Sequence, residues 1–321
     1  MAGMIYEDTL DFATYLAQTE AKAKVKPAAG WIESLIEDLG KEDTERKAYL
    51  PWEKTHNLFA FRPGEVTLWA GVNGHGKSLM TGLTTLSLMA QDERSCIASF
   101  EMKPRKTLER MSRQWSGQRP AGEWMRDEQV LATYRDLYEQ FGAFTDKRLW
   151  LYDQQGTVKT DVILGVMRYC AAELRIRQFV LDSLMKCVQG EDDYNGQKRF
   201  VDEVTAIARD TGMHVHLVHH LRKLGSESDI PDKSDVKGTG AISDQVDNML
   251  LVWRNKKKES DQHAGKTVAV DEPDARLICC KQRNGEWEGR IALWFDAESQ
   301  QYVPKAGSPA MNMAAWPHRS I

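Results

Sequence analysis

The chain has 321 residues, of which 41% are hydrophobic and 28% charged, so it is long enough to bury most of its surface around one large core. This composition excludes a disulfide-stabilised mini-protein and an intrinsically disordered chain. Its 43 Lys and Arg residues against 47 Asp and Glu residues give a net charge of −4, so any polyanion has to be bound by local basic loops.

The longest apolar stretches, such as residues 249–253, are far shorter than the roughly 20 residues of a membrane helix, and the first residues form no basic-then-apolar signal pattern. The five cysteines include no Cys-x-x-Cys pair, and their odd number argues against a disulfide framework. We therefore expect a cytoplasmic protein with reduced thiols and no membrane contact.

Residues 1–50 contain two helix-like stretches, 6–19 and 31–39, which are separated by a Lys-Pro-Ala-Ala-Gly break. The second stretch carries an apolar face formed by Trp31, Ile32, Leu35, Ile36 and Leu39. That face has to pack either on the chain's own core or on a neighbouring subunit. Residues 1–50 are thus predicted to form an N-terminal helical arm.

From residue 51 to residue 304, short apolar runs alternate with helical segments, which predicts an α/β domain with a central sheet flanked by helices. The runs expected to form strands are 65–70, 96–100, 149–152, 178–181, 214–218, 248–253, 275–280 and 290–295. Residues 305–321 include Gly307 and Pro309 and have few periodic apolar positions, so they are predicted to form a flexible tail.

A phosphate-binding loop (P-loop) follows the first apolar run. The residues Gly71-Val72-Asn73-Gly74-His75-Gly76-Lys77-Ser78 fit the pattern G-x-x-x-x-G-K-[ST], and a helical stretch follows from residue 79 to residue 89. Glycines let successive backbone N–H groups turn toward phosphate oxygens, and the helix N-terminus stabilises the anion. The pattern predicts nucleotide contacts from Gly71, Asn73, Gly74, Gly76, Lys77 and Ser78, with Ser78 also binding Mg²⁺.

Two carboxylates stand at the ends of further predicted strands. Asp182 closes the run 178–181 and is expected to bind Mg²⁺ together with Ser78, although an Asp in this place is otherwise often a helix cap or a turn residue. Glu101 follows the run 96–100, where it can orient water toward a γ-phosphate or be a solvated strand end.

Six segments distributed over the chain occur in the order of one known family. They are Phe61-Arg62-Pro63-Gly64-Glu65, Ser99-Phe100-Glu101-Met102, Leu181-Asp182-Ser183, His219-His220-Leu221-Arg222, Asp235-Val236-Lys237-Gly238-Thr239-Gly240-Ala241-Ile242 and Lys281-Gln282-Arg283-Asn284-Gly285. From Pro51 to Tyr302 the chain resembles RecA-like hexameric replicative helicases of the DnaB type, and most closely the helicase half of phage primase-helicases and of mitochondrial Twinkle. The resemblance implies a RecA-like core with a mostly parallel sheet.

The resemblance also implies roles for single residues. Glu101 would polarise the attacking water, and His220 would sense the γ-phosphate, with the adjacent His219 as the alternative. Lys281 and Arg283 would cross a subunit boundary and stabilise the transition state at the neighbour's nucleotide, although such a pair can also be a solvated strand end.

Two further expectations concern aromatic and imidazole rings. Arg254 and Phe295 match positions that flank the nucleotide base in the phage-type relatives. His214, His216 and His220 lie on one face of a predicted strand, which leaves a metal site open as an alternative, although no Cys or carboxylate completes the cluster.

The resemblance also implies that the segment between His220 and Ile242 lines the channel of the ring and holds single-stranded DNA. The residues expected to contact its phosphates are Arg222, Lys223, Lys237, Gly238 and Gly240. A second family segment, here residues 186–198, contains the acids Glu191, Asp192 and Asp193, which put a phosphate contact there in doubt. The run Lys256-Lys257-Lys258 is predicted to be a solvated loop.

Together these features predict a Mg²⁺-dependent NTPase, using ATP or dTTP, that forms a homohexameric ring and translocates 5′ to 3′ on single-stranded DNA as a replicative helicase. A recombinase-type RecA relative and a nucleotide-switch loader factor are the alternatives. Because about 50 residues precede the core, a primase is expected as a separate partner, and the resemblance implies a separate DNA polymerase as well. The acidic tail by which the phage relatives bind their polymerase cannot be carried over, since no Asp or Glu follows Glu298. A phage-encoded protein of this kind would work in the cytoplasm of the bacterial host.

Overall fold

The structure is a computed structural model that describes residues 46–119, 126–188, 190, 193–222, 225–226, 228–237 and 240–313, together with Ile32 and Ile36. The chain divides into two units, Met1–Glu45 and Arg46–Ile321. Of the predicted arm, residues 1–50, the structure describes Ile32 and Ile36, which are both helical, and residues 46–50, which form no helix and pair with the following chain through a bridge between Ala48 and Phe61. The second unit contains the predicted α/β domain.

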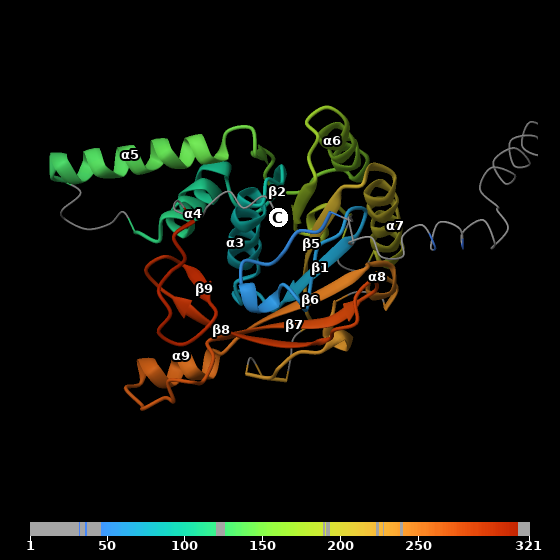
Figure 1. Cartoon of the computed structure of the whole chain (residues 1–321). Helices are drawn as coiled ribbons and strands as arrows, with labels where there is room; N and C mark the ends of the chain where they lie inside the picture. Colours follow the sequence, from blue (N-terminus) through green and yellow to red (C-terminus); the bar gives the residue numbers. More distant parts are fainter. Residues whose placement is uncertain are drawn as a thin grey trace, which may run out of the picture. The chain divides into compact units, whose positions relative to one another are not determined.

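In the described part of the second unit, the strands form one nine-stranded sheet in the order β3-β2-β4-β5-β1-β6-β7-β8-β9 (Figure 1). The strands are β1 (Val66–Gly71), β2 (Ser95–Ser99), β3 (Leu149–Tyr152), β4 (Gln178–Asp182), β5 (His214–His220), β6 (Asn248–Arg254), β7 (Ala275–Gln282), β8 (Gly289–Asp296) and β9 (Gln301–Val303). The six strands from β3 to β6 in the sheet order are parallel, and β7, β8 and β9 follow as antiparallel strands. The predicted fold class, an α/β core with a central, mostly parallel sheet flanked by helices, is confirmed.

Helices cover both faces of this sheet. They are α3 (Lys77–Ala90), α4 (Pro104–Ser116), α5 (Glu128–Thr145), α6 (Thr160–Ala172), α7 (Tyr194–Thr211) and α8 (Gly240–Gln245). A further helix, α9 (Lys256–His263), follows β6, and short 3₁₀ turns lie at Glu53–Thr55, Leu184–Lys186 and Lys233–Asp235. One apolar cluster joins the sheet to α6, α7 and α8, and a second joins it to α3, α4 and α5 (Figure 1). On β1, Leu68 belongs to the first cluster and Trp69 to the second, as alternation along a strand requires.

Burial on both faces explains why the strands could be recognised as continuous apolar runs. All eight predicted runs are strands, with ends that differ by one or two residues. The ninth strand, β9, was not predicted, because it has only three residues, one of which is polar.

The chain before β1 and the chain after β9 both pack on the second cluster. Trp52 is buried, and its indole N–H donates to the carbonyl of Tyr302 at 2.7 Å. Packing therefore starts near Arg46, a few residues before the boundary expected at residue 51. In the predicted tail, the backbone of Met311 exchanges two hydrogen bonds with the side chain of Gln301, and Met313 is buried. Residues 314–321 lie outside the described part.

The lysine run was predicted to be a solvated loop, and this prediction is wrong. It opens α9, whose N-cap Asn255 accepts a hydrogen bond from the N–H of Lys258 at 3.0 Å. Lys258 is buried and pairs with Asp274 at 2.7 Å. The sequence did not reveal this capped helix and its partly buried ion pair, because three consecutive lysines are normally exposed.

Candidate nucleotide-binding site

The P-loop, Glu101, Asp182 and His220 meet at one edge of the sheet because β1, β2, β4 and β5 are parallel. The P-loop follows β1, Glu101 follows β2, Asp182 ends β4 and His220 ends β5. In the register of the strands, Ser99 lies opposite Asp182, and Gly71 lies opposite His220. Crevices at the carboxyl edge of parallel strands are the usual ligand sites of such sheets.

Backbone conformation and close neighbours explain why the P-loop requires glycine at three of its positions. Gly74 and Gly76 adopt left-handed φ values of +80° and +87°, which side chains rarely tolerate. A Cβ on Gly71 would lie 2.7 Å from the carbonyl oxygen of Val252. A Cβ on Gly76 would collide with the hydroxyl of Tyr302, so this loop also depends on a residue from the unpredicted strand β9. Asn73 is exposed on the loop.

Lys77 is the first residue of α3 and is only 7% exposed. Its ammonium donates to the carbonyls of Gly71 at 2.8 Å and Val72 at 3.3 Å. Burial lowers the pKa of Lys77, while the charges of Asp182 and Glu101 act in the opposite direction. The charge is thus held at the loop by neutral acceptors, from which it can turn to a phosphate.

Ser78 and Asp182 form the predicted metal pair. The hydroxyl of Ser78 donates to Oδ2 of Asp182 at 2.6 Å. Burial raises the pKa of Asp182, and the nearby charge of Glu101 raises it further, whereas the Ser78 hydrogen bond, Lys77 and Arg110 lower it. A hydroxyl and a carboxylate oxygen side by side, in a site that penalises an unpaired negative charge, fit a Mg²⁺ ion.

Glu101 is exposed just beyond β2. Its charge nevertheless acts on both Lys77 and Asp182, so it lies close to the phosphate end of the site. A carboxylate in this place has access to solvent water and to the reacting phosphate, which is what a residue that orients the attacking water needs.

Arg110 of α4 was not predicted as a site residue. Together with Ser78 and Asp182 it lines a small hollow below the P-loop. Burial lowers the pKa of Arg110, and Asp182 counteracts this. Arg110 belongs to a polar, amphipathic helix, in which most arginines are exposed. The sequence alone therefore does not distinguish Arg110 from an ordinary surface arginine.

The two adjacent histidines at the end of β5 have different surroundings. His219 is fully buried, and its Nε2–H donates to the carbonyl of Lys237 at 2.6 Å. Burial lowers the pKa of His219 to about 4. His220 is partly exposed and lies opposite Gly71 of the P-loop. Of the two, His220 is therefore placed to meet a nucleotide, and His219 holds the chain beyond the strand.

Two of the three histidines considered for a metal site, His214 and His216, are core residues. His214 donates from Nδ1 to the carbonyl of Arg62 at 2.7 Å and accepts at Nε2 from the hydroxyl of Thr67 at 2.9 Å. His216 accepts from the indole of Trp69 at 3.2 Å and bonds the side chain of Gln178 at 3.0 Å. Within the described ranges, no three His, Cys, Asp or Glu side chains gather in a way that could hold a metal ion.

These buried histidines predict a pH-dependent stability. Burial lowers the pKa of His214 from 6.5 to about 4, so the unfolded chain binds a proton in a range where the folded chain does not. Stability from this residue is complete above about pH 6.5 and is lost as the pH falls toward 4, by about 3 kcal/mol. Urea unfolding measured from pH 7 to pH 4 should show the loss. In His214→Asn the slope should be smaller by about one proton, and an unchanged slope would contradict the neutral, buried state.

Arg254 and Phe295 are adjacent but do not form an open slot. The guanidinium of Arg254 lies over the ring of Phe295, 5.3 Å from its centroid, and Arg254 also pairs with Glu259. Phe295 in turn contacts Tyr302, with ring centroids 5.3 Å apart. The pair lies beside the P-loop, since the backbone N–H of Arg254 donates to His75 at 3.3 Å. A base would have to stack on this layer or separate its two members.

Lys281 and Arg283 lie at the opposite edge of the sheet from the P-loop. Because β7 is antiparallel to β6, Gln282 pairs with Asn248, the first residue of β6, and Asn248 pairs with Thr67 near the start of β1. The two side chains point to the same side, as their spacing predicts, and both contact the last residues of α8.

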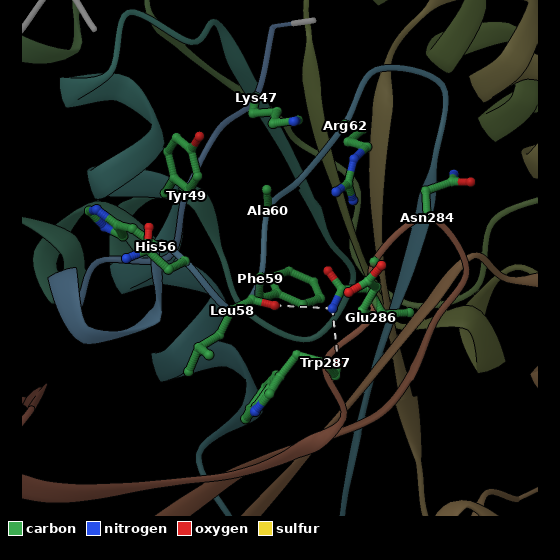
Figure 2. Close-up of a pocket in the computed structure, with 13 residues that line it drawn as sticks. Lys47, Tyr49, His56, Leu58, Phe59, Ala60, Arg62, Asn284, Glu286 and Trp287 are labelled. Carbon is green, nitrogen blue, oxygen red and sulfur yellow. Dashed lines mark hydrogen bonds between the residues drawn. The ribbon is translucent and has the colours of Figure 1, made fainter. Parts of the chain in front are cut away.

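A cavity of about 510 Å³ lies at this second edge, between the chain before β1 and the turn from β7 to β8. Figure 2 shows Lys47 and Arg62 on one side of it and Trp287 on the other. Gln282 lines the cavity, and its side-chain amide joins the two walls by donating to the carbonyls of Leu58 at 3.1 Å and Trp287 at 2.9 Å. The cavity is separate from the nucleotide-binding site.

Of the predicted DNA contacts, Arg222, Lys237 and Gly240 are described, and Lys223 and Gly238 lie outside the described residues. The segment folds back on β5 through a bridge between Leu221 and Val236. Arg222 is exposed, but its side chain also bonds the carbonyl of Ser234. In the second segment, Asp193 is the N-cap of α7, which gives one of the three acids a structural role. In the described part of the chain, we find no helix with the length and apolarity to span a bilayer.

Comparisons with known proteins agree with this geometry. The model of the DnaB-like helicase C-terminal domain matches residues 55–304. A solved DnaB-like replicative helicase, studied with its interactions with primase, has a TM-score of 0.69 at 15% identity over 91% of this chain and 70% of that chain. The ATPase domain of G40P has a TM-score of 0.70 at 14% identity over 87% of this chain and 99% of that domain. The resemblance to DnaB-type replicative helicases is thereby confirmed: the chain belongs to the DnaB-like helicase C-terminal domain family.

Proposed function

We propose that this protein is a ring-forming replicative DNA helicase that hydrolyses ATP or dTTP with Mg²⁺ and moves 5′ to 3′ along single-stranded DNA. The observation that carries this proposal is the placement of the P-loop and the Lys281–Arg283 pair at opposite edges of one sheet. The family match and the geometry of the nucleotide site support the hydrolysis.

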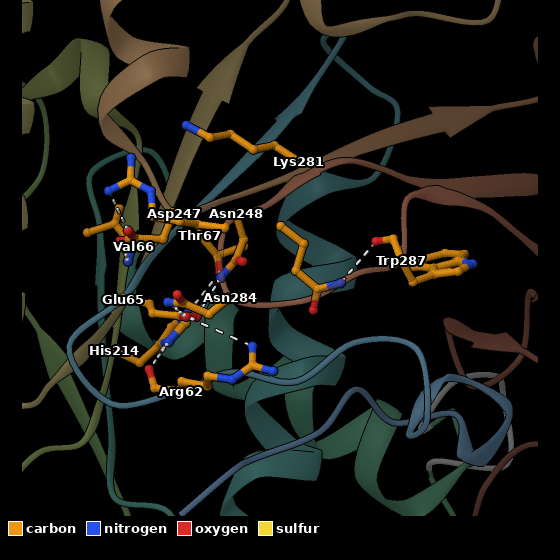
Figure 3. A network of polar contacts seen from close by, with 12 residues as sticks. Arg62, Glu65, Val66, Thr67, His214, Asp247, Asn248, Lys281, Asn284 and Trp287 are labelled. Atoms are coloured by element: carbon orange, nitrogen blue, oxygen red, sulfur yellow. Dashed lines mark hydrogen bonds and ion pairs between the residues drawn. The ribbon is translucent and has the colours of Figure 1, made fainter. Parts of the chain in front are cut away.

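The separation of the two edges favours action between subunits. From Val66 to Gly71, β1 covers five residue steps, or about 17 Å. Arg283 donates its backbone N–H to the residue before β6, Asp247, which lies beside Val66 at the start of β1 (Figure 3). A side chain there cannot reach a phosphate at the far end of its own β1. If Lys281 and Arg283 contact a nucleotide, a second copy of the chain holds it. Repeated head-to-tail contacts of this kind form a ring when the rotation between subunits closes and a filament when it does not, and the family match favours the ring.

The residues of one subunit would divide the chemistry as follows. The P-loop amides and Lys77 bind the phosphates, and Glu101 orients the water that attacks the γ-phosphate. Ser78 and Asp182 would hold Mg²⁺, which compensates charge on the β- and γ-phosphates. Lys281 and Arg283 of the adjacent subunit would stabilise the charge that develops in the transition state.

Single-stranded DNA would be gripped without sequence preference by the segment after β5. Arg222 and Lys237 supply positive charge and Gly240 a backbone N–H, while the net charge of −4 makes a grip outside this segment weak. Through the relative studied with primase, the proposal extends to a separate primase and, by family resemblance, to a separate polymerase.

A fork-unwinding assay tests the proposal. A duplex with a 5′ single-stranded tail should be unwound in the presence of Mg²⁺ and ATP or dTTP, whereas a duplex with only a 3′ tail should not. Asp182→Asn should unwind neither. DNA-stimulated hydrolysis without unwinding of any fork would instead indicate a recombinase-type protein, and nucleotide binding without turnover would indicate a switch.

A further inference from the structure

Two buried polar side chains at the P-loop lack a hydrogen-bond partner within the described part of the chain. Tyr302 of β9 is 1% exposed, and its hydroxyl makes no hydrogen bond there. His75 of the loop is equally buried, and its Nε2 has no partner there. Because burial of a polar group without a partner destabilises a fold, packing alone does not explain why these side chains are polar.

Tyr302 contacts the P-loop and the layer of Arg254 and Phe295 at the same time. Its ring packs beside Phe295, with centroids 5.3 Å apart, and the two residues are paired between β8 and β9. Its hydroxyl reaches Gly76, because a Cβ built on that glycine would collide with the hydroxyl oxygen. Gly76 is the N-cap of α3 and directly precedes Lys77. A shift of the Tyr302 hydroxyl therefore acts on the residue before the P-loop lysine.

The Arg254 side of the layer is anchored more firmly than the Phe295 side. The guanidinium of Arg254 lies over Phe295 and pairs with Glu259, whose carboxylate also pairs with Lys256 at 3.1 Å. The backbone N–H of Arg254 donates to Nδ1 of His75 at 3.3 Å, so this residue is also tied to the loop. The ring of Phe295 is only partly buried, and Tyr302 lies beside it. Phe295 is thus the member of the layer that can be displaced.

A base that stacks on both members of the layer has to separate them. A planar cation and an aromatic ring beside the loop that binds the phosphates are surfaces on which a base stacks. Because stacked atoms lie about 3.5 Å apart, a base between the two groups needs about 7 Å, whereas the guanidinium of Arg254 is 5.3 Å from the ring centroid of Phe295. The displaced Phe295 ring would press on Tyr302, whose hydroxyl is already in contact with Gly76.

We propose that Tyr302 is a positioning residue that couples base binding to the P-loop: a base inserted between Arg254 and Phe295 acts through the Tyr302 hydroxyl on Gly76 and sets Lys77 and the loop amides for hydrolysis. This inference rests on the proposed function and deepens it, because the base then contributes to catalysis as well as to binding. Binding energy from a part of the substrate remote from the reacting atoms is used to raise kcat, so a triphosphate without a base is a slow substrate.

A double-mutant cycle on kcat tests this coupling. Tyr302→Phe removes only the hydroxyl, and Phe295→Leu removes the planar face but keeps an apolar side chain. Hydrolysis is measured for the unsubstituted chain, both single variants and the double variant, with saturating ATP or dTTP, whichever is hydrolysed faster, at equal particle mass. Tyr169→Phe is the matched control, because it removes a hydroxyl from an exposed tyrosine of α6, and it should keep the activity of the unsubstituted chain.

Tyr302→Phe should lower kcat about tenfold with KM nearly unchanged, since a misplacement of about 1 Å costs up to about 10²-fold in rate. Phe295→Leu should lower kcat by a similar factor and also raise KM, because stacking on the base is lost. The double variant should be no slower than Phe295→Leu, since both substitutions interrupt one path. Losses that multiply in the double variant would overturn the coupling, as would an unchanged kcat in Tyr302→Phe.

Thermal unfolding shows that a loss of activity is not a loss of folding. Tyr302→Phe removes a buried hydroxyl that has no partner in the described part of the chain, so its midpoint should equal or exceed that of the unsubstituted chain. A lower midpoint would show that the hydroxyl stabilises the fold, which would contradict its assignment as a positioning group.

Inorganic tripolyphosphate provides a second test, because it carries the phosphates but no base. The unsubstituted chain should hydrolyse it with a much lower kcat than the nucleotide, and Tyr302→Phe should not lower that value further. A merely structural role of Tyr302 in the P-loop would lower both kcat values by the same factor, and equal kcat values for the two substrates would also overturn the coupling. If the unsubstituted chain hydrolyses neither substrate, the proposed function itself fails, so the two failures are distinguishable.

Discussion

Replacing Lys77 by alanine is expected to abolish hydrolysis. The ammonium is buried at the P-loop and bonded only to neutral carbonyls among the described residues, so it is held close to where phosphate charge must be compensated. Removing one preorganised donor of this kind typically lowers kcat by about 10² to 10³. Binding of triphosphate should weaken as well, because Lys77 is expected to contact the β- and γ-phosphates.

The effect of Lys77→Ala is measured as the rate of phosphate release and as the affinity for a fluorescent triphosphate analogue. Lys266→Ala is the matched control, since Lys266 is an exposed lysine paired with Asp261 and remote from the P-loop in the sequence. The control should retain the activity of the parent. Thermal unfolding of both variants shows whether they are folded. Near-normal turnover by a folded Lys77→Ala chain would contradict the assignment of the P-loop.

Replacing Arg283 by alanine should inactivate rings made only of the variant. An arginine supplied in trans to a transferring phosphoryl group is worth about 10³ to 10⁵ in kcat. Arg290→Ala, which removes an exposed arginine from the neighbouring strand β8, should leave hydrolysis close to that of the parent. The Arg283→Ala variant should still bind nucleotide, because its own P-loop is at the other edge of the sheet.

The decisive part is the mixture of the Arg283→Ala chain with the Lys77→Ala chain. Each is inactive alone, but a ring that contains both has sites in which an intact P-loop faces an intact Arg283. Hydrolysis should therefore recover to a part of the parent rate. If the mixture stays inactive although the two chains exchange into common particles, Arg283 does not act in trans.

The sequence allowed the sheet and the P-loop to be predicted because both depend on local patterns. Strands covered on both faces are continuous apolar runs, and the P-loop is a contiguous motif in which glycines are required for steric reasons. The meeting of Glu101, Asp182 and His220 with the P-loop followed from one rule, that parallel strands end at the same edge.

Contacts between distant segments could not be predicted in this way. The edge at which Lys281 and Arg283 lie depends on β7 being antiparallel to β6, and their hold on α8 depends on where a six-residue helix ends. Arg110 is a site residue only because α4 packs beside β4, and Lys258 is buried only because Asp274 faces it. Such pairings depend on tertiary packing, which leaves no periodic signal in the chain.

The electrostatics of the site also emerge only from the structure. The carboxylates of Asp182 and Glu101 and the cations Lys77 and Arg110 lie near one another, with only Glu101 exposed, so two negative charges face two positive charges in the absence of ligand. Entry of a triphosphate and Mg²⁺ adds charges of both signs to this arrangement. Because its own charges are balanced, the site is expected to bind triphosphate and Mg²⁺ together more readily than triphosphate alone or Mg²⁺ alone.

The central claim is that the nucleotide is hydrolysed between two copies of this chain. It is tested most directly by measuring the specific rate of hydrolysis over a range of protein concentrations while particle mass is recorded, with and without oligo-dT. The account predicts a rate that rises as single chains assemble into rings and that rises again with oligo-dT. A constant specific rate in particles with the mass of a single chain, unaffected by oligo-dT, would contradict it.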